Sequence, residues 1–309
     1  MSKMKQQYGQ PKDNYHAKIM AKSTAIFIVC VILTLICLVP IFILIVNATH
    51  AHMDLAKNPS NFWFGGSLAE NFNTLRGLPD PETGKLSGAA RQYSGSFDVV
   101  QGYLNSLLIA GCTTGLTVFF SAMTAYGLTV YDFKVRGAAY TFIIAVMMIP
   151  VQVSSAGFVK FMYDLGLINN FIPLIVPAIA APAVIFFMVS YMKSSFPLDI
   201  VEASRIDGCG EFRTFLTIAI PMMKPAIAVQ AIFAFVANWN NFYTQNMILK
   251  SDKLVTMPIM VSKVLGFDKN VDYGVNYLCI TLSILPIVVI YFILSKFIIA
   301  GVALGGVKE

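Results

Sequence analysis

The chain has 309 residues, of which 57% are hydrophobic and only 12% are charged. Soluble domains carry about 25% charged residues, so this composition leaves too few charges to cover a soluble surface and indicates a membrane protein. The formal net charge of +6 is modest. Because excess Lys and Arg usually encode orientation in a membrane protein, nucleic-acid binding is not indicated. The five cysteines contain no C-x-x-C pair, which argues against a disulfide framework or a zinc site.

The first 23 residues are polar and basic, and the apolar run after them is too long for the core of a signal peptide. We therefore expect an N-terminal tail followed by a retained membrane helix. A bilayer-spanning helix needs roughly 20 apolar residues. Six segments qualify, and none contains Asp, Glu, Lys or Arg: 24–46, 104–130, 137–158, 171–192, 226–249 and 274–294. Proline is tolerated in membrane helices, so we expect kinks at Pro40, Pro150, Pro177, Pro182 and Pro286.

The distribution of Lys and Arg predicts the orientation of the chain. These residues concentrate in the N-terminal tail, in the short connection that contains Lys134 and Arg136, and in the loop 193–225. The three regions would share the cytoplasmic side, and six spans would return the C-terminus to that side. The segments 47–103 and 250–273 would then lie outside, the first as an extended loop rather than a second domain.

The polar loop between the fourth and fifth spans has the pattern of a helix, a turn and a second helix. Pro197 suits the first turn of a helix, and Asp199 and Glu202 lie near that start, where the helix dipole favours negative charge. Glu202 and Arg205 are three residues apart and are expected to pair. Gly208 then ends the helix, as glycine commonly does. A second face at helical spacing contains Ile200, Ala203 and Ile206.

This loop resembles the EAA motif of the permease subunits of binding-protein-dependent ABC importers. That pattern is Glu-Ala-Ala, three residues, Gly, nine residues, Ile, one residue and Leu-Pro. The residues that match it in spacing are Glu202, Ala203, Gly208, Ile218 and Pro221, with Ser204 in place of the second Ala and Ile220 in place of Leu. The Asp207-Gly208 pair and Pro225 are similar to the carbohydrate branch of the family.

The resemblance covers roughly residues 104–309. Asn105-Ser106 opens the second span as in sugar permeases, and the run from Asn238 to Phe242 is similar to their Trp-Asn-Glu/Asp-Phe element. The ending Gly305-Gly306-Val307-Lys308 is similar to the Gly-Ala-Val-Lys tail of the maltose-type second permease. Residues 47–103 match no pattern of the family.

The resemblance implies an all-α polytopic fold with six transmembrane helices and a cytoplasmic coupling helix, which is the type I ABC importer permease. A six-span permease domain, 24–300, would include the extracytoplasmic loop 47–103 and the coupling loop 193–225, between cytoplasmic tails 1–23 and 301–309. The protein would be a non-catalytic, multi-pass subunit of the bacterial inner membrane that carries a sugar or oligosaccharide. The coupling residues would be Glu202, Ala203, Ser204, Arg205, Asp207 and Gly208.

The same resemblance implies several partners. These are a homologous second permease, two cytoplasmic ATPase subunits that hold ATP and Mg, and an extracytoplasmic solute-binding protein, which the loop 250–273 would contact. No cofactor, catalytic residue or metal site is expected in this chain. The charge-free spans contain no obvious proton relay or strong sodium site, so energy would have to arrive mechanically.

A second group of polar residues lies in the fifth predicted span. Polar side chains in a membrane helix are costly unless they face protein or a water-filled cavity. Amides can hydrogen-bond sugar hydroxyls, and aromatic faces can stack on sugar rings. One interpretation is therefore a substrate path, and the other is inter-helix hydrogen bonding with an interfacial aromatic belt. The residues concerned are Asn238, Trp239, Asn240, Asn241 and Tyr243.

Other functions stay open at this point. A polyol or glycerol-phosphate substrate fits the same family. A self-sufficient secondary carrier or channel would need intramembrane ion ligands, and no predicted span carries a charged one. A sensor or scaffold that binds an ATPase for signalling would also present the loop 193–225.

Overall fold

The computed structural model describes residues 12–80, 83–94, 98–266 and 271–305. Within these ranges every regular element is helical and no strand occurs, which confirms the predicted all-α class. The α-helices are α1 (Lys12–Asn47), α2 (His52–Lys57), α3 (Leu68–Leu75), α4 (Gly88–Tyr93), α5 (Val99–Val130), α6 (Arg136–Met147), α7 (Val151–Asp164), α8 (Ile172–Ile175), α9 (Pro182–Ser195), α10 (Asp199–Ile206), α11 (Glu211–Thr214), α12 (Ile220–Met222), α13 (Lys224–Trp239), α14 (Phe242–Ile248), α15 (Met257–Leu265) and α16 (Tyr273–Gly305). Two 3-10 turns, η1 (Val176–Ile179) and η3 (Asp252–Leu254), and a π-helical turn, η2 (Phe215–Ala219), complete the set.

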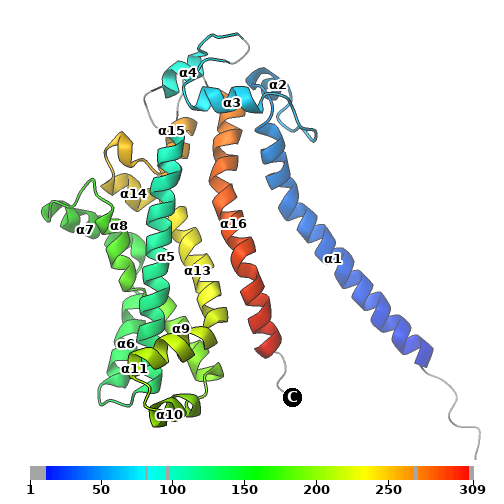
Figure 1. The fold of residues 1–309 in the computed structure, drawn as a ribbon. Coiled ribbons are helices and arrows are strands. Elements are labelled where there is room, and N and C mark those ends of the chain that lie inside the picture. Colours follow the sequence, from blue (N-terminus) through cyan, green and yellow to red (C-terminus); the bar gives the residue numbers. More distant parts are fainter. Residues whose placement is uncertain (1–11, 81–82, 95–97, 267–270, 306–309) are drawn as a thin grey trace, which may run out of the picture.

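The long helices run between two ends of a bundle (Figure 1). We call the end where α2, α3, α4 and α15 gather the cap end, and the end where α10 lies the loop end. Both segments that were predicted to lie outside, 47–103 and 250–273, contribute helices to the cap end. Helix α1 starts towards the loop end and α16 finishes there, so the described arrangement agrees with an even number of crossings between them.

Helix α5 is the central helix, and it packs against α9, α13 and α15. One hydrophobic core near the cap end joins α5 to α13, α15 and α16, and Trp239 and Met260 are fully buried in it. A second core near the loop end joins α5 to α9 and to the segment after α10. Its most buried members include Ala122, Met188 and Phe215. The 32 residues of α5 correspond to about 48 Å, so one helix connects both cores.

In the segment that was predicted as an extended loop, the described residues 47–80, 83–94 and 98 form a cap that contains α2, α3 and α4. Leu75 of α3 and Tyr93 of α4 are fully buried in the same core as Leu278 of α16. The buried Asn71 amide donates to the carbonyls of Ala48 and His50, each at 2.9 Å. The buried residues Leu75 and Tyr93 of the cap therefore share one core with α16.

Four of the six predicted spans lie in helices that are long and apolar enough to cross a membrane. These helices are Lys18–Asn47, Val99–Val130, Ile172–Ser195 and Tyr273–Phe297. The third of them continues through η1, a 3-10 turn that contains Pro177, and α9 begins at Pro182. Pro40 and Pro286 lie inside continuous helices.

Each of the other two predicted spans is divided into two helices, at the predicted kink of Pro150 in one case and at an interruption that was not predicted in the other. Helix α6 ends at Met147, and α7 runs sideways from it (Figure 1). Pro150 explains this break because proline lacks an amide hydrogen and disfavours helical geometry in the residue before it. Helix α13 ends at Trp239, and α14 starts only after Asn241. The segments Glu211–Met222 and Lys224–Trp239 form a pair that is bent by 80°.

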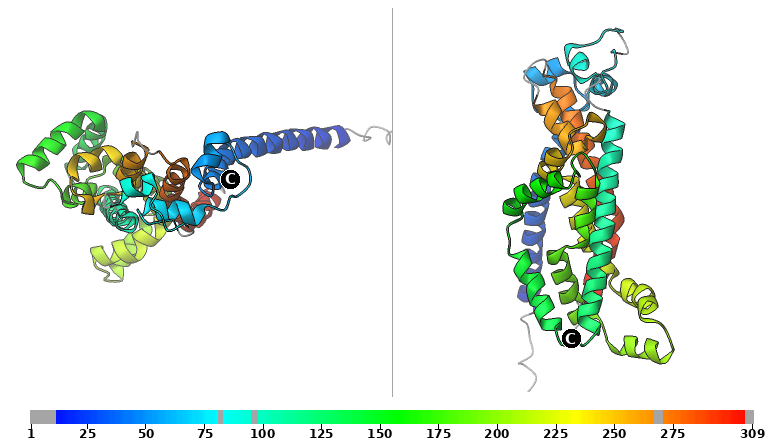
Figure 2. Two further views of the ribbon diagram at one scale, coloured as in Figure 1. Left: turned by 90° about the horizontal axis from the view of Figure 1, so that it is seen from above. Right: turned by 90° about the vertical axis from the view of Figure 1, so that its left-hand side faces the viewer.

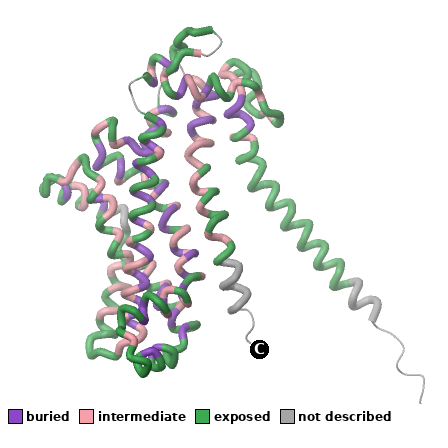
Figure 3. The backbone as a smooth tube through the Cα atoms, in the orientation of Figure 1, coloured by how far each residue is buried: buried purple, intermediate pink, exposed green. Residues whose placement is uncertain are grey.

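Helix α1 leaves the rest of the bundle (Figure 2) and contacts mainly α16 near the cap end. No residue in its most apolar stretch is buried, and its exposure continues along most of the helix (Figure 3). A helix with an apolar surface on every side requires lipid or another protein around it.

Gly274, in the first turn of α16, is the tightest junction between the cap and the bundle. A Cβ atom there would lie 2.5 Å from the His50 carbonyl oxygen and 2.7 Å from the Asn71 amide. We predict that Gly274→Ala destabilises the protein by about 1–3 kcal/mol, the usual cost of overpacking, measured by thermal unfolding in detergent. Gly111→Ala in α5, where nothing lies within 4 Å, is the control and should leave the melting temperature unchanged or higher. Equal behaviour of the two variants would contradict the tight junction.

Candidate functional site: the α10 loop and the break in the fifth span

The loop 193–225 folds as a helix, a glycine turn and a second helix, as its pattern predicted. Helix α10 begins after Pro197 and ends at Ile206. Gly208 has φ +75°, a left-handed conformation that favours glycine. Helix α11 starts three residues later and continues through η2 into α12. The two helical segments can therefore fold back on each other at the loop end.

One face of α10 is fixed to the bundle by Val201, Ser204 and Thr214, of which the sequence pattern singled out only Ser204. Val201 is 1% exposed and belongs to the same buried cluster as Phe215. The Ser204 and Thr214 hydroxyls form a buried hydrogen bond of 2.6 Å. Ser204, one of the predicted coupling residues, thus faces inward and joins α10 to α11.

The other predicted coupling residues lie on the exposed side of the turn. Ile206 is 86% exposed, and Ile200, on the preceding turn of α10, is also exposed. Glu202 makes no ion pair among the described residues. This surface combines apolar side chains with an unpaired carboxylate, and its exposed members include Glu202, Ala203, Arg205, Asp207 and Gly208.

Arg205 pairs with Glu211, not with Glu202 as the spacing predicted. The Arg205 Nε donates to Glu211 Oε1 at 2.7 Å, and a second guanidinium nitrogen lies 3.3 Å from Oε2. The Tyr131 hydroxyl donates to the same carboxylate at 2.7 Å, and the guanidinium lies 5.7 Å from the centre of the Tyr131 ring. Because the turn at Gly208 brings α11 back over α10, Glu211 comes closer to Arg205 than its neighbour on the helix does. We call Tyr131, Arg205 and Glu211 the clamp.

The clamp shifts the acidity of its members. The hydrogen bonds from Arg205, and then from Tyr131, stabilise the carboxylate and lower the pKa of Glu211. Burial, followed by the hydrogen bond to Glu211, raises the pKa of Tyr131 to about 12. Tyr131 therefore stays protonated at neutral pH and remains a donor, and it connects the end of α5 to the α10 loop.

The predicted path residues of the fifth span surround the break between α13 and α14 and do not share one face. The side chain of Asn241 caps α14 by accepting from the Thr244 amide at 3.2 Å. The Asn238 amide donates to the Ala234 carbonyl at 2.7 Å, and the buried Gln245 amide donates to the Asn238 carbonyl at 3.0 Å. These bonds satisfy backbone and side-chain groups at the break.

Trp239 is separated from its polar neighbours. It is 1% exposed, its ring stacks on Phe235 at 5.7 Å, and its indole nitrogen donates to the Ser283 carbonyl at 2.9 Å. Asn240 and Tyr243, in contrast, are exposed. The structure therefore places Trp239 in the core and leaves only these two predicted path residues on an open surface.

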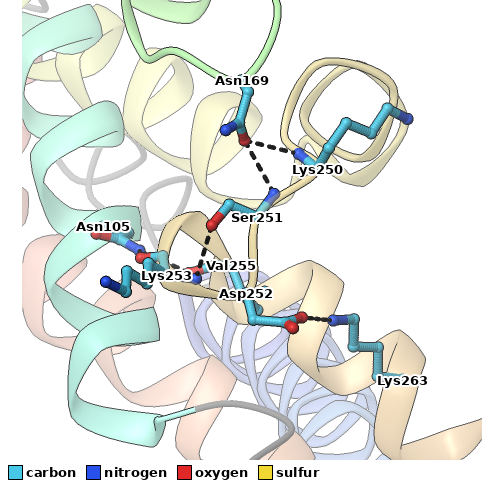
Figure 4. Close-up of polar contacts among 8 residues, drawn as sticks. All are labelled: Asn105, Asn169, Lys250, Ser251, Asp252, Lys253, Val255 and Lys263. Carbon is cyan, nitrogen blue, oxygen red and sulfur yellow. Dashed lines mark hydrogen bonds and ion pairs between the residues drawn. The ribbon is translucent and has the colours of Figure 1, made fainter.

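The chain between α14 and α15 is held by two asparagines on other elements (Figure 4). Asn169 accepts from the amides of Lys250 and Ser251 at 3.1 and 2.9 Å. On the other side, the Asn105 amide donates to the carbonyls of Lys253 and Val255 at 3.0 and 2.9 Å (Figure 4). We call residues 249–256 the pinned segment. Asn105 was noted in the sequence only as the start of a span, whereas the roles of Asn169 and of its left-handed backbone, φ 61°, were missed.

These features define a multi-spanning α-helical membrane protein with an exposed helical loop at one end. Residues 117–303 match the family described as binding-protein-dependent transport system inner membrane component. The chain belongs to this family, the integral-membrane permease subunits of ABC importers.

The names of several relatives refer to sugar transport. The chain is 35% identical over 251 residues to the arabinooligosaccharides transport system permease protein AraQ of Bacillus subtilis (strain 168), which covers 79% of this chain and 87% of that one. It is 28% identical over 295 residues to the trehalose/maltose transport system permease protein MalG of Thermococcus litoralis, at 93% and 97% coverage. A chain of a bacterial ABC transporter involved in alginate import has the same fold, with a TM-score of 0.69, 18% identity and coverage of 94% and 99%.

We predict that Glu211→Gln lowers the thermal stability of the protein at neutral pH by weakening the clamp. The folded pKa of Glu211 is lowered, so its stabilising contribution is complete above the ordinary glutamate pKa of about 4.3 and is lost as pH falls through the lowered value. The difference in melting temperature between wild type and variant should be constant near neutrality and disappear in acid. Asp199→Asn, an exposed carboxylate of α10 outside the clamp, is the control. A difference that persists unchanged below both pKa values would contradict the charge-based role.

Proposed function

We propose that this chain forms half of the translocation path of an importer for a sugar or oligosaccharide. The names of the relatives support this substrate class, since they refer to arabino-oligosaccharides, to melibiose, raffinose and stachyose, and to trehalose and maltose. A homologous second permease would complete the path. The exposed apolar surface of α1 and its position away from the bundle support a second membrane subunit beside it.

The observation that carries the proposal is the surface of α10. An apolar side chain that is 86% exposed, Ile206, lies on the same eight-residue helix as the unpaired Glu202. Exposed apolar surface next to charge is typical of a protein interface. The other face of the helix is held in the core by Val201 and the Ser204–Thr214 hydrogen bond, so a force on the surface would move the bundle. We infer that this helix docks in a cleft of a cytoplasmic ATPase, with Glu202 pairing a basic residue there.

Energy would come from the two ATPase subunits, which would hold ATP and Mg. The predicted spans contain no acidic or basic side chain, and the described residues contain no cluster of three or more His, Cys, Asp or Glu that suits a metal. This chain would therefore act as a non-catalytic subunit. Closure of the ATPase dimer would move α10 as a lever, and the bundle would alternate between outward and inward access.

The orientation follows from the distribution of charge. The loop end, where α1 starts and α16 finishes, would be cytoplasmic because Lys and Arg concentrate in its connections. The cap end would then face outwards and meet the solute-binding protein. The pinned segment supports this assignment, because two hydrogen bonds donated by Asn105 and two accepted by Asn169 hold it in one conformation. Preorganised loops lose less entropy on binding.

Of the five residues predicted to line the substrate path, we propose that only Asn240 and Tyr243 contact the sugar. Their exposed side chains could meet a sugar by hydrogen bonding and stacking, respectively. Asn238 and Asn241 would maintain the break in the helix, and Trp239 would hold α13 against α16. Asn238, Trp239 and Asn241 would therefore contribute to transport by positioning Asn240 and Tyr243.

Within the same family, a polyol or glycerol-phosphate substrate is the second candidate. The uncharged side chains of Asn240 and Tyr243 favour a neutral sugar over a phosphate ester, which would require a cation. A self-sufficient carrier would transport sugar in liposomes without an ATPase, and a sensor would show no sugar flux in the complete complex.

We predict that Glu202→Lys abolishes sugar uptake by the assembled transporter while the variant still inserts into the membrane. The reason is that a lysine would face the basic residue expected in the ATPase cleft. Uptake of radiolabelled sugar and the amount of protein in the membrane fraction are the two measurements. Asp132→Lys is the matched control, since this carboxylate is 97% exposed at the same end but lies outside the α10 loop. Normal uptake by the Glu202 variant would refute the docking role.

We also predict that Asn240→Ala lowers uptake about tenfold, the effect of losing roughly 1.4 kcal/mol of sugar binding in the path, without changing the melting temperature. Trp239→Phe should do the reverse, with a lower melting temperature, because it removes a buried hydrogen bond. Unchanged uptake in Asn240→Ala and Tyr243→Ala together would place the path elsewhere.

A further inference from the structure

A cavity of about 460 Å³ opens at the loop end between α5, α6, α9 and the start of the α10 loop. It is not part of the clamp or of the break in the fifth span. Thr129 comes from α5, Arg136 and Tyr140 from α6, and Lys193 from the last turn of α9. Leu198, the residue that precedes α10, closes it on the side of the coupling loop.

The polar part of this cavity is basic and incompletely paired. Arg136 has one carboxylate partner, Asp132, at 3.9 Å, and that carboxylate is 97% exposed, so water screens the pair. The Lys193 ammonium lies 4.9 Å from the centre of the Tyr140 ring and forms no ion pair among the described residues. Two positive charges thus border one cavity with a single weak counter-charge.

A third polar group in the wall also lacks a partner. The Thr129 hydroxyl oxygen is buried and makes no hydrogen bond to any described residue. A buried hydroxyl without a partner costs free energy. Because this oxygen has almost no exposed surface, a rotation of the Thr129 side chain would be needed before a ligand oxygen in the cavity could satisfy it. The remaining wall is apolar and includes Val189 and Met192 of α9.

We propose that this cavity binds the headgroup phosphate of an anionic phospholipid. Arg136 and Lys193 would contact the phosphate oxygens, the Thr129 hydroxyl would turn into the cavity and donate to one of them, and the apolar wall would receive the start of the acyl chains. The cavity lies at the ends of membrane helices, where lipid headgroups lie, and basic pockets between such helices on the cytoplasmic side suit these lipids. The cytoplasmic assignment rests on the proposed orientation.

Because of the position of the cavity, a bound lipid would affect how the coupling loop moves with the bundle. The cavity wall passes directly from α9 to Leu198 and then into α10. A bound headgroup would connect α6 to the base of the coupling loop, which have no other ionic connection in the described residues. Transport would then depend on anionic lipid independently of the sugar.

The test uses the full-length protein in nanodiscs of phosphatidylglycerol and phosphatidylcholine. After transfer to detergent, phosphatidylglycerol that stays bound is counted by native mass spectrometry. A Lys or Arg near an anionic lipid contributes about 1 kcal/mol, which is about fivefold in affinity. We therefore expect R136Q and K193Q each to lower lipid retention about fivefold, and the double variant to lower it further. R136K keeps the positive charge, so it should retain most of the lipid that the wild type retains. Thr129→Val should also lower retention.

Lys134→Gln is the matched control because it removes a positive charge two residues from Arg136, outside the cavity. Equal retention in wild type, K134Q and the double variant would overturn the proposal. A second arm adds inorganic phosphate at millimolar concentration. Displacement of the lipid would assign the site to free phosphate and overturn the lipid assignment. Neither sugar nor ATP is needed, so failure of the proposed transport function would leave the result unaffected, and failure of lipid binding would not affect the transport assays.

Discussion

The attachment of α10 to the bundle is the interaction on which the other features depend. An eight-residue helix is too short to be stable alone in water, so its form must come from packing. Val201 and the Ser204–Thr214 pair provide that packing on one face, and the clamp closes over the turn from the side. Because all of these contacts use the inner face and the turn, Glu202 and Ile206 are left free on the outside. The loop is therefore held in one conformation and still exposes its outer face to a partner.

The central helix α5 relates this attachment to the opposite end of the molecule. At the loop end it is followed by Tyr131 of the clamp, and near the cap end it carries Asn105, which holds the pinned segment. Ser106 adds a buried hydrogen bond to the amide of Met257 at 2.8 Å. A continuous helix transmits displacement with little deformation. The two surfaces proposed for protein partners are therefore connected by one rigid element about 48 Å long.

Local patterns in the sequence were sufficient for part of this arrangement. The helix after Pro197 and the turn at Gly208 follow from the preferences of two residue types, and both were predicted. The ion pair between Arg205 and Glu211 was not predicted. Glu211 comes close to Arg205 only because of the way the turn at Gly208 folds, which the sequence does not show. Burial of Ser204 and Trp239 likewise depends on neighbours that are distant in sequence. A kink was predicted at Pro150, but not that the helix ends there. Proline lies inside continuous helices at Pro40 and Pro286, and the sequence alone does not distinguish these cases.

The break in the fifth span raises a more specific physical problem. Backbone groups that leave a helix within a membrane must find partners in the protein or in a water-filled cavity. Here the Asn238 carbonyl accepts from Gln245, whose own oxygen accepts from the buried Thr256 hydroxyl at 2.5 Å. Two side chains, Gln245 and Thr256, therefore restore part of the bonding that the helix gives up, and they connect the break to the start of α15. Asn240 takes no part in this network and is exposed beside it. An exposed amide at the end of an apolar helix is costly in lipid but not in water, so its position favours a wet path at this break over a lipid-facing surface.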